Sequence, residues 1–116
     1  MIRNDGSYPR ETRENMRGGN GSVLIEYLCT KEELKSATRL CARLTLGPKC
    51  SIGFHVHDDE EEIFHIISGK GTVNDAGTDR PIQAGDTILT GNGAGHAIAA
   101  DEDSTLVLLA LIVQFQ

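Results

Sequence analysis

Residues 47–69, GPKCSIGFHVHDDEEEIFHIISG, set two histidines two positions apart and place a carboxylate shortly after them. In an extended strand, residues i and i+2 project from the same face, so His55 and His57 are expected to point side by side. An acidic turn over residues 58–61 separates this strand from a second one, which begins at Glu62. The stretch therefore predicts two strands that bring two imidazoles and one carboxylate together as part of a metal site.

A third imidazole comes from a separate part of the chain. From Gly85 the sequence runs GDTILTGNGAGH, which predicts a strand followed by a glycine-rich turn that delivers His96. An imidazole on its own turn is what a closed site needs, because it holds the ion from a further direction. The two stretches together therefore make one candidate site.

The spacing of these residues resembles the two sequence motifs of the cupin family, and in particular the small single-domain cupins of the conserved-barrel type in the RmlC-like superfamily. The glycines, histidines and glutamate of the first motif are matched by Gly47, His55, His57, Glu62 and Gly69. Seven residues separate Gly47 from His55, four separate His57 from Glu62, and six separate Glu62 from Gly69, as in the motif. The second motif is matched by Gly85, Gly93 and His96. The two motifs and their linker span residues 47–100.

In cupins, the two histidines and the glutamate of the first motif and the histidine of the second bind one divalent metal inside a small β-barrel. The resemblance therefore implies four metal ligands, namely His55, His57, Glu62 and His96. Glu61 competes for the carboxylate position, but the six-residue gap to Gly69 and the strand parity favour Glu62. Three imidazoles and one carboxylate suit a first-row ion (Mn, Fe, Co, Ni, Cu or Zn) and match calcium poorly.

The remainder of the chain favours an all-β fold. Short strands separated by glycine-bearing turns are predicted over residues 22–28, 37–46, 72–74, 80–83, 87–89, 96–99 and 105–115. A capping-box pattern over Thr30–Glu33 predicts one brief helix. With the resemblance, this gives a cupin double-stranded β-helix, a jelly-roll barrel of antiparallel strands. Residues 22–116 are expected to form that barrel domain, and residues 1–21 an N-terminal arm.

The arm is polar and glycine-rich, without a sustained period. Its cluster of Arg10, Arg13 and Arg17 suits an acidic surface such as that of this protein. A frayed, solvated tail is the alternative.

Composition narrows the class of partner. The 116 residues are enough for one domain, and the formal net charge of −6 argues against nucleic acid and against anionic membranes. Three cysteines without CxxC spacing indicate a reducing compartment, and the N-terminus lacks an apolar signal core. The longest apolar run is too short to span a bilayer. We therefore expect a cytoplasmic protein with a small-molecule ligand.

The last predicted strand, residues 105–115, is apolar at almost every position, so both of its faces require cover. One face can pack inside the barrel. The other is expected to pack against a second copy of the chain, which predicts a homodimer.

Two classes of function follow from the candidate site. The first is a metal-dependent enzyme acting on a small oxygen-bearing carbon acid, of the dioxygenase, decarboxylase, isomerase or lyase type. The second is a non-catalytic module that binds or senses a small molecule, since fold does not decide function. Catalytic candidates beyond the metal ligands are Glu61, Arg43 and Cys50. Arg43, like Arg39 on the same strand face, could hold a substrate carboxylate only if the polar face of the strand turns inward, and the alternative is an outward face with apolar neighbours in the core.

Overall fold

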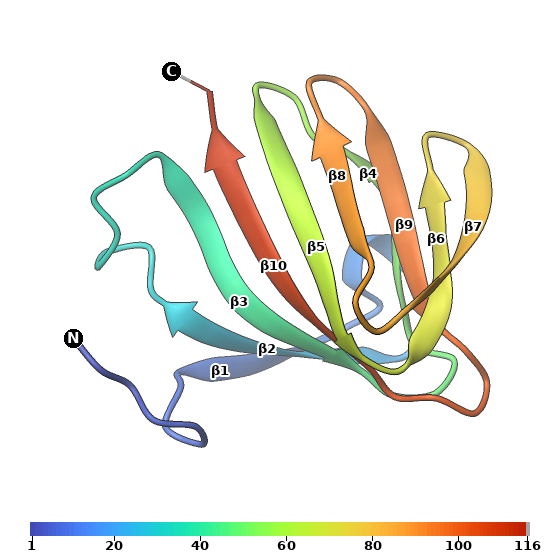
Figure 1. Cartoon of the computed structure of the whole chain (residues 1–116), viewed down its shortest axis with the longest axis horizontal. Helices are drawn as coiled ribbons and strands as arrows, with labels where there is room; N and C mark the ends of the chain where they lie inside the picture. Colours follow the sequence, from blue (N-terminus) through green and yellow to red (C-terminus); the bar gives the residue numbers. More distant parts are fainter. Residues whose placement is uncertain (116) are drawn as a thin grey trace.

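The computed structural model describes residues 1–115, and it confirms the all-β cupin architecture. All strand pairs are antiparallel and form two sheets (Figure 1). The larger sheet has the order β1 (Arg10–Glu14), β2 (Ser22–Cys29), β3 (Thr38–Leu46), β10 (Leu106–Gln114), β5 (Glu60–Ser68) and β8 (Thr87–Gly91). The smaller sheet has the order β4 (Ser51–Val56), β9 (Gly95–Ala100), β6 (Lys70–Asp75) and β7 (Thr78–Gln83).

The core lies between the sheets and follows from the alternation of side chains along each strand. On β3, Ala42, Leu44 and Leu46 are buried, and the smaller sheet contributes residues such as Ile52 and Ile98. Each large aliphatic side chain buried in this way stabilises the fold by about 1.5–3 kcal/mol. At Arg43, the apolar face of β3 is turned inward and the arginine lies outside, which is the second of the two orientations considered above.

Strand β10 lies in the middle of the larger sheet, between β3 and β5. Its inner residues are buried, whereas the outer row remains half-buried. That outer row consists of Val107, Leu109, Leu111 and Val113. The homodimer contact expected at this face stays a prediction.

The expected helix after Thr30 is wrong. Glu33 does reach back to the Thr30 amide (2.7 Å), but its own amide donates to the Thr30 carbonyl and the chain continues as a turn. Arg3 binds both carboxylate oxygens of Glu33, at 3.0 and 2.8 Å. The capping box thus closes a short loop between β2 and β3.

No helix among residues 1–115 has the length and hydropathy of a membrane span.

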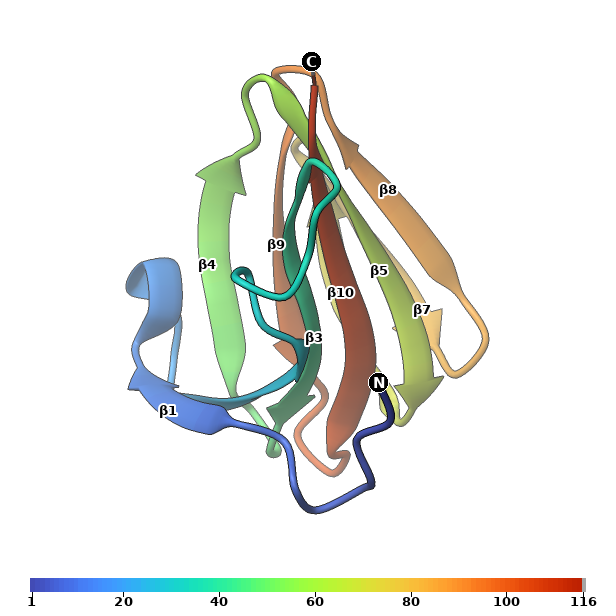
Figure 2. The same ribbon diagram turned by 90° about the vertical axis from the view of Figure 1, so that its left-hand side faces the viewer.

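The helical segment that does form is a 3-10 turn, η1 (Met16–Gly18), inside the arm. Strand β1 precedes it and adds an edge to the larger sheet by pairing with β2. η1 then packs against β4 of the smaller sheet, as Figure 2 shows at the left of the view. The arm therefore joins both sheets, and the boundary between arm and barrel at residues 21 and 22 stays a prediction.

Candidate metal centre

Four side chains from the two sheets converge in the barrel interior. The nitrogen and oxygen atoms of His55, His57, Glu62 and His96 that could hold an ion all lie within 4.8 Å of one another. His55 lies on β4, His57 directly follows that strand, His96 lies on β9 and Glu62 on β5. The structure thus brings together all four residues that the sequence motifs single out.

A β-bulge directs the first two histidines. The register between β4 and β9 shifts between Ile52 and His55, so these residues, three positions apart, both line the interior. From there the usual alternation returns, with Phe54 and Val56 exposed and His57 buried. His55 and His57 therefore point to the same side, as the spacing predicted.

The converging atoms are spaced like neighbours around a common ion. Oε1 of Glu62 lies 2.9 Å from Nε2 of His57, 3.0 Å from Nε2 of His96 and 3.9 Å from Nε2 of His55. Nε2 of His96 lies 3.1 Å from Nε2 of both other histidines. Ligands at right angles and about 2.1 Å from a metal are separated by about 3 Å.

Hydrogen bonds to the far side of two rings set their tautomers. Nδ1 of His55 lies 2.8 Å from the Gly53 carbonyl oxygen, and Nδ1 of His57 lies 2.5 Å from Oε2 of Glu60. Carbonyl and carboxylate oxygens only accept, so both Nδ1 atoms carry the proton and donate it. In the neutral rings, the Nε2 lone pairs then face the centre.

His96 is held more tightly than the other two histidines. Its side chain is fully buried, its ring stacks on Phe64 (4.6 Å between centroids, 6° between planes), and Nδ1 lies 2.9 Å from the Thr90 hydroxyl. Stacking and the hydroxyl contact together fix the plane of the ring. Burial lowers the pKa of His96, which favours the neutral form that a metal requires.

The electrostatics of the cluster favour an ionised carboxylate among imidazoles. Burial opposes ionisation of Glu62, but its contacts with the three imidazoles outweigh burial, and the pKa of Glu62 is lowered. The hydrogen bond to Glu62 raises the pKa of His57. The Glu62 carboxylate thus attracts positive charge to this point.

Glu60 is a site residue that sequence reasoning missed. The acidic stretch 58–61 was expected to be a solvated turn, yet Glu60 is only 9% exposed. Its carboxylate binds Arg39 through two contacts of 2.9 and 2.8 Å, and Arg39 lowers the pKa of Glu60. Strand parity could have predicted that Glu60 faces inward, because it lies two positions before Glu62 and shares its face.

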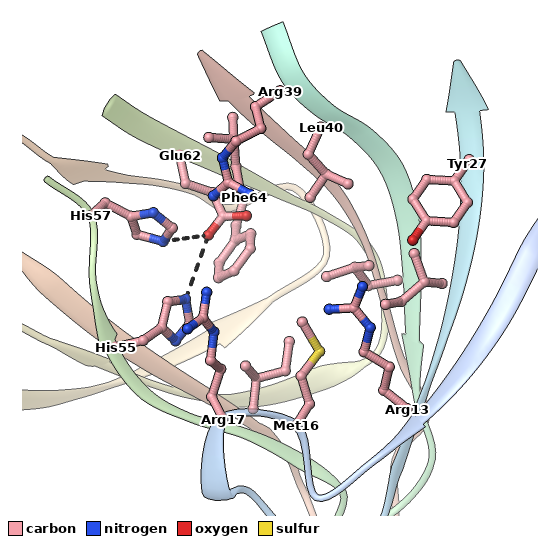
Figure 3. Close-up of a pocket in the computed structure, with 14 residues that line it drawn as sticks. Arg13, Met16, Arg17, Tyr27, Arg39, Leu40, His55, His57, Glu62 and Phe64 are labelled. Atoms are coloured by element: carbon pink, nitrogen blue, oxygen red, sulfur yellow. Dashed lines mark ion pairs between the residues drawn. The ribbon is translucent and has the colours of Figure 1, made fainter. Parts of the chain in front are cut away.

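A cavity of about 100 Å³ opens beside the cluster (Figure 3). His55, His57 and Glu62 line one part of it, and aliphatic residues of both sheets line the rest. Polar side chains complete the lining, namely Arg13, Arg17, Tyr27 and Arg39. The sequence drew attention to the arginines of the arm, but nothing in it indicated that two of them reach this cavity.

The other catalytic candidates lie outside the cavity lining. Arg43 binds Glu26 (3.0 Å) and Asp5 (2.8 Å) and covers the ring of Tyr8. Glu61 is half-buried on the opposite parity of β5, and Cys50 packs at the edge of the core. The geometry therefore supports none of the three as a group that reaches a ligand at the cluster.

Comparison with known proteins agrees with the fold and the motif. The family model of the cupin domain matches residues 42–112. An oxalate-binding protein from Thermotoga maritima is 39% identical over 113 residues, which cover 97% of this chain and 93% of that protein. The crystal structure of a predicted oxalate decarboxylase from Thermotoga maritima has a TM-score of 0.94 at 38% identity, covering 99% of this chain and 100% of that chain.

A more distant structure shares the fold alone. The polyketide cyclase RemF from Streptomyces resistomycificus is 14% identical, with a TM-score of 0.78 over 100% of this chain and 80% of that chain. The family match covers more than half of the chain and includes all four residues of the cluster. This chain therefore belongs to the cupin family.

Proposed function

We propose that the protein binds one divalent first-row metal through His55, His57, Glu62 and His96, and that a small chelating acid of the oxalate class binds on that metal. One observation carries the proposal. The Nε2 lone pairs of His55 and His57 and an ionised oxygen of Glu62 face one buried point. Lone pairs and a carboxylate without a cation between them repel, whereas a metal ion satisfies all of them.

The class of ligand follows from the cavity and from the number of protein ligands. Four ligands leave two positions on a six-coordinate ion, which two oxygens of one small acid can fill. The cavity of about 100 Å³ is small beside the roughly 300–1,000 Å³ of pockets for drug-sized ligands. The names of the curated Thermotoga relative and of the solved Thermotoga structure support oxalate as the model ligand. When bound, the metal would supply Lewis-acid polarisation of the acid.

Binding is the function that the geometry supports best, and decarboxylation is the second candidate. Cleavage of the oxalate carbon–carbon bond releases CO2 and leaves an electron pair that must take up a proton to give formate. Tyr27 carries a hydroxyl in the cavity, and burial raises the pKa of Tyr27, so it retains its proton at neutral pH. However, Tyr27 lies across the cavity from Glu62 in Figure 3. A proton donor beside the cluster is therefore missing from the lining among residues 1–115.

The test is to load the purified protein with each of the six ions and to measure bound metal, with His96→Ala as the comparison. We expect about one ion per wild-type chain and a large loss in the variant, because His96 supplies one of only four ligands. Release of formate from oxalate by the loaded protein would establish the second candidate. Equal metal content in wild type and variant would refute the proposed site. The cytoplasmic location and the homodimer remain predictions from the sequence.

A further inference from the structure

The turn of the N-terminal arm is a built element. The Asn15 amide donates to the Gly21 carbonyl (2.8 Å), and the Asn15 side chain donates to the Gly19 carbonyl (3.1 Å). Asn20 then joins the turn to β4, because its carbonyl accepts from the Ser51 amide (2.8 Å) and its amide donates to the Ser51 hydroxyl (2.8 Å). The turn over residues 15–21 is thereby closed on itself and fastened to the strand that bears His55.

Two glycines allow the turn and β4 to meet backbone to backbone. A Cβ atom on Gly53 would lie 2.0 Å from the Arg17 carbonyl oxygen, and one on Gly19 would lie 2.2 Å from the Ser51 carbonyl oxygen. Any side chain at either position would push the two segments apart. Gly53 also lies in the bulge that directs His55 and accepts its Nδ1 hydrogen bond. The position of the turn is therefore tied to the position of a predicted ligand.

Arg17 occupies a backbone conformation that costs free energy. Its φ of 54° and ψ of 30° are left-handed, a region that non-glycine residues rarely adopt. Positions 18 and 19 are glycines, whereas position 17, which has the left-handed conformation, carries a long cationic side chain. Figure 3 shows that this side chain rises beside His55 with its guanidinium directed toward Glu62. The strained position thus points a positive charge at the cluster.

The other two arginines of the cavity have carboxylate partners, whereas Arg17 pairs with no carboxylate of residues 1–115. Arg39 is bound by Glu60, and Arg13 contacts Glu11 at 2.6 Å. No ion pair of Arg17 occurs in the part of the chain that the structure describes. Among the arginines that line the cavity, Arg17 is therefore the one whose guanidinium can still bind an anion.

The charges of the site match a dianion. A divalent ion, the Glu62 carboxylate and three neutral imidazoles together carry one positive charge. A bound dicarboxylate reverses this to one negative charge, and the Arg17 guanidinium then brings the sum to zero. With a bound monoanion, the metal, its protein ligands, the acid and Arg17 would together keep one positive charge. Charge complementarity therefore selects acids with two negative charges over those with one.

We propose that Arg17 is the specificity residue of this cavity, and that it binds the outer oxygens of a metal-chelating dicarboxylate through its planar fork. The inference rests on the proposed function, since it requires a ligand on the metal. Arginine is suited to this role because its guanidinium presents paired donors to planar anions. The arm thereby forms the wall of the site that distinguishes ligands by their charge.

The test measures calorimetric affinity of the metal-loaded protein for oxalate and for oxamate, in which an amide replaces one carboxylate. Arg17→Met removes the charge, Arg17→Lys retains charge without the fork, and Arg10→Met is the matched control on the same arm outside the cavity. Gly19→Ala keeps the arginine but displaces the turn. Metal content is measured for every variant.

We expect Arg17→Met to weaken oxalate binding by about tenfold to a hundredfold at unchanged metal content, the range for lost hydrogen bonds to charged groups. The preference for oxalate over oxamate should shrink with it, Arg17→Lys should be intermediate, and Gly19→Ala should resemble Arg17→Met. Unchanged oxalate affinity in Arg17→Met, or an equal loss in Arg10→Met, would overturn the role of Arg17. Failure of the wild-type protein to bind oxalate would instead refute the proposed function.

Discussion

Glu60 accepts a hydrogen bond of 2.5 Å from Nδ1 of His57 while Arg39 holds the same carboxylate through two contacts. The hydrogen bond between Glu60 and His57 matters because Nε2 of His57, on the opposite side of the ring, faces the cluster. A carboxylate behind an imidazole fixes the tautomer and increases the basicity of the ligating nitrogen. Glu60 therefore acts on the candidate metal through His57.

Glu60→Gln should weaken metal binding by about tenfold to a hundredfold, the usual range for such supporting partners. Glutamine keeps the size of the side chain but loses the negative charge that supports His57. Competition with a chelator of known affinity measures the change. Glu61→Gln, next along the strand, is the control and should bind metal like the wild type. Equal affinities in the two variants would contradict the role given to Glu60.

The choice between two neighbouring glutamates can be tested by truncation. Glu62→Ala should lower the amount of bound metal because it removes one of four ligands, whereas Glu61→Ala should leave it unchanged. Elemental analysis of each purified and metal-loaded variant measures this. If Glu62→Ala keeps a full complement of metal, Glu62 is not a ligand.

Metal affinity should depend on pH through His57. His57 must lose its Nε2 proton to bind metal, and its hydrogen bond to Glu62 raises the pKa of His57 above the ordinary value. As the pH falls through that raised pKa, protons compete and affinity should drop by about tenfold per pH unit. The lowered pKa of Glu62 and of His96 keeps both groups in their binding forms over this range. Chelator competition between pH 7 and 8.5 measures the dependence, and an affinity that does not change with pH would contradict the role given to His57.

Phe64 should support both the core and the site. It is 1% exposed and stacks on the His96 ring, so Phe64→Ala should cost about 3–5 kcal/mol in the free energy of unfolding. Urea denaturation measures the cost. The control is Phe54→Ala on β4, because Phe54 is 53% exposed and its removal should change stability by only about 0.5 kcal/mol. Similar values for the two variants would argue against this packing role.

Removal of metal should lower thermal stability. An ion that binds only the folded state adds about 2.7 kcal/mol when its concentration is a hundred times the dissociation constant. The melting temperature should therefore fall on chelation and recover when metal is returned. His57→Ala, with the site disabled, should show no such response to the chelator.

The four clustered residues were predictable because strand parity and motif spacing are local. His55 and His57 needed only the period of a strand, and the choice of Glu62 followed from strand parity and the six-residue gap to Gly69. Glu60 obeyed that rule too, but four adjacent acids resemble a solvated turn unless Arg39, twenty-one positions away, is known to meet one of them. Its burial is a tertiary effect.

The arm was less predictable for the same physical reason. Arg17 reaches the cavity because Gly53, far along the chain, allows its backbone to approach, and no local pattern reports such a contact. The capping box after Thr30 failed in the opposite way. Only its Glu33 half forms, and Glu33 is also bound by Arg3 in the loop between β2 and β3. Propensity yields to tertiary context at both places.

The most direct test is a calorimetric titration of oxalate into the protein loaded with metal and into the same protein stripped of it. If the clustered residues hold a metal that takes a chelating acid, one oxalate should bind per loaded chain, and the stripped protein should give no binding signal. Equal binding to both forms, or none to a fully loaded protein, would contradict the account.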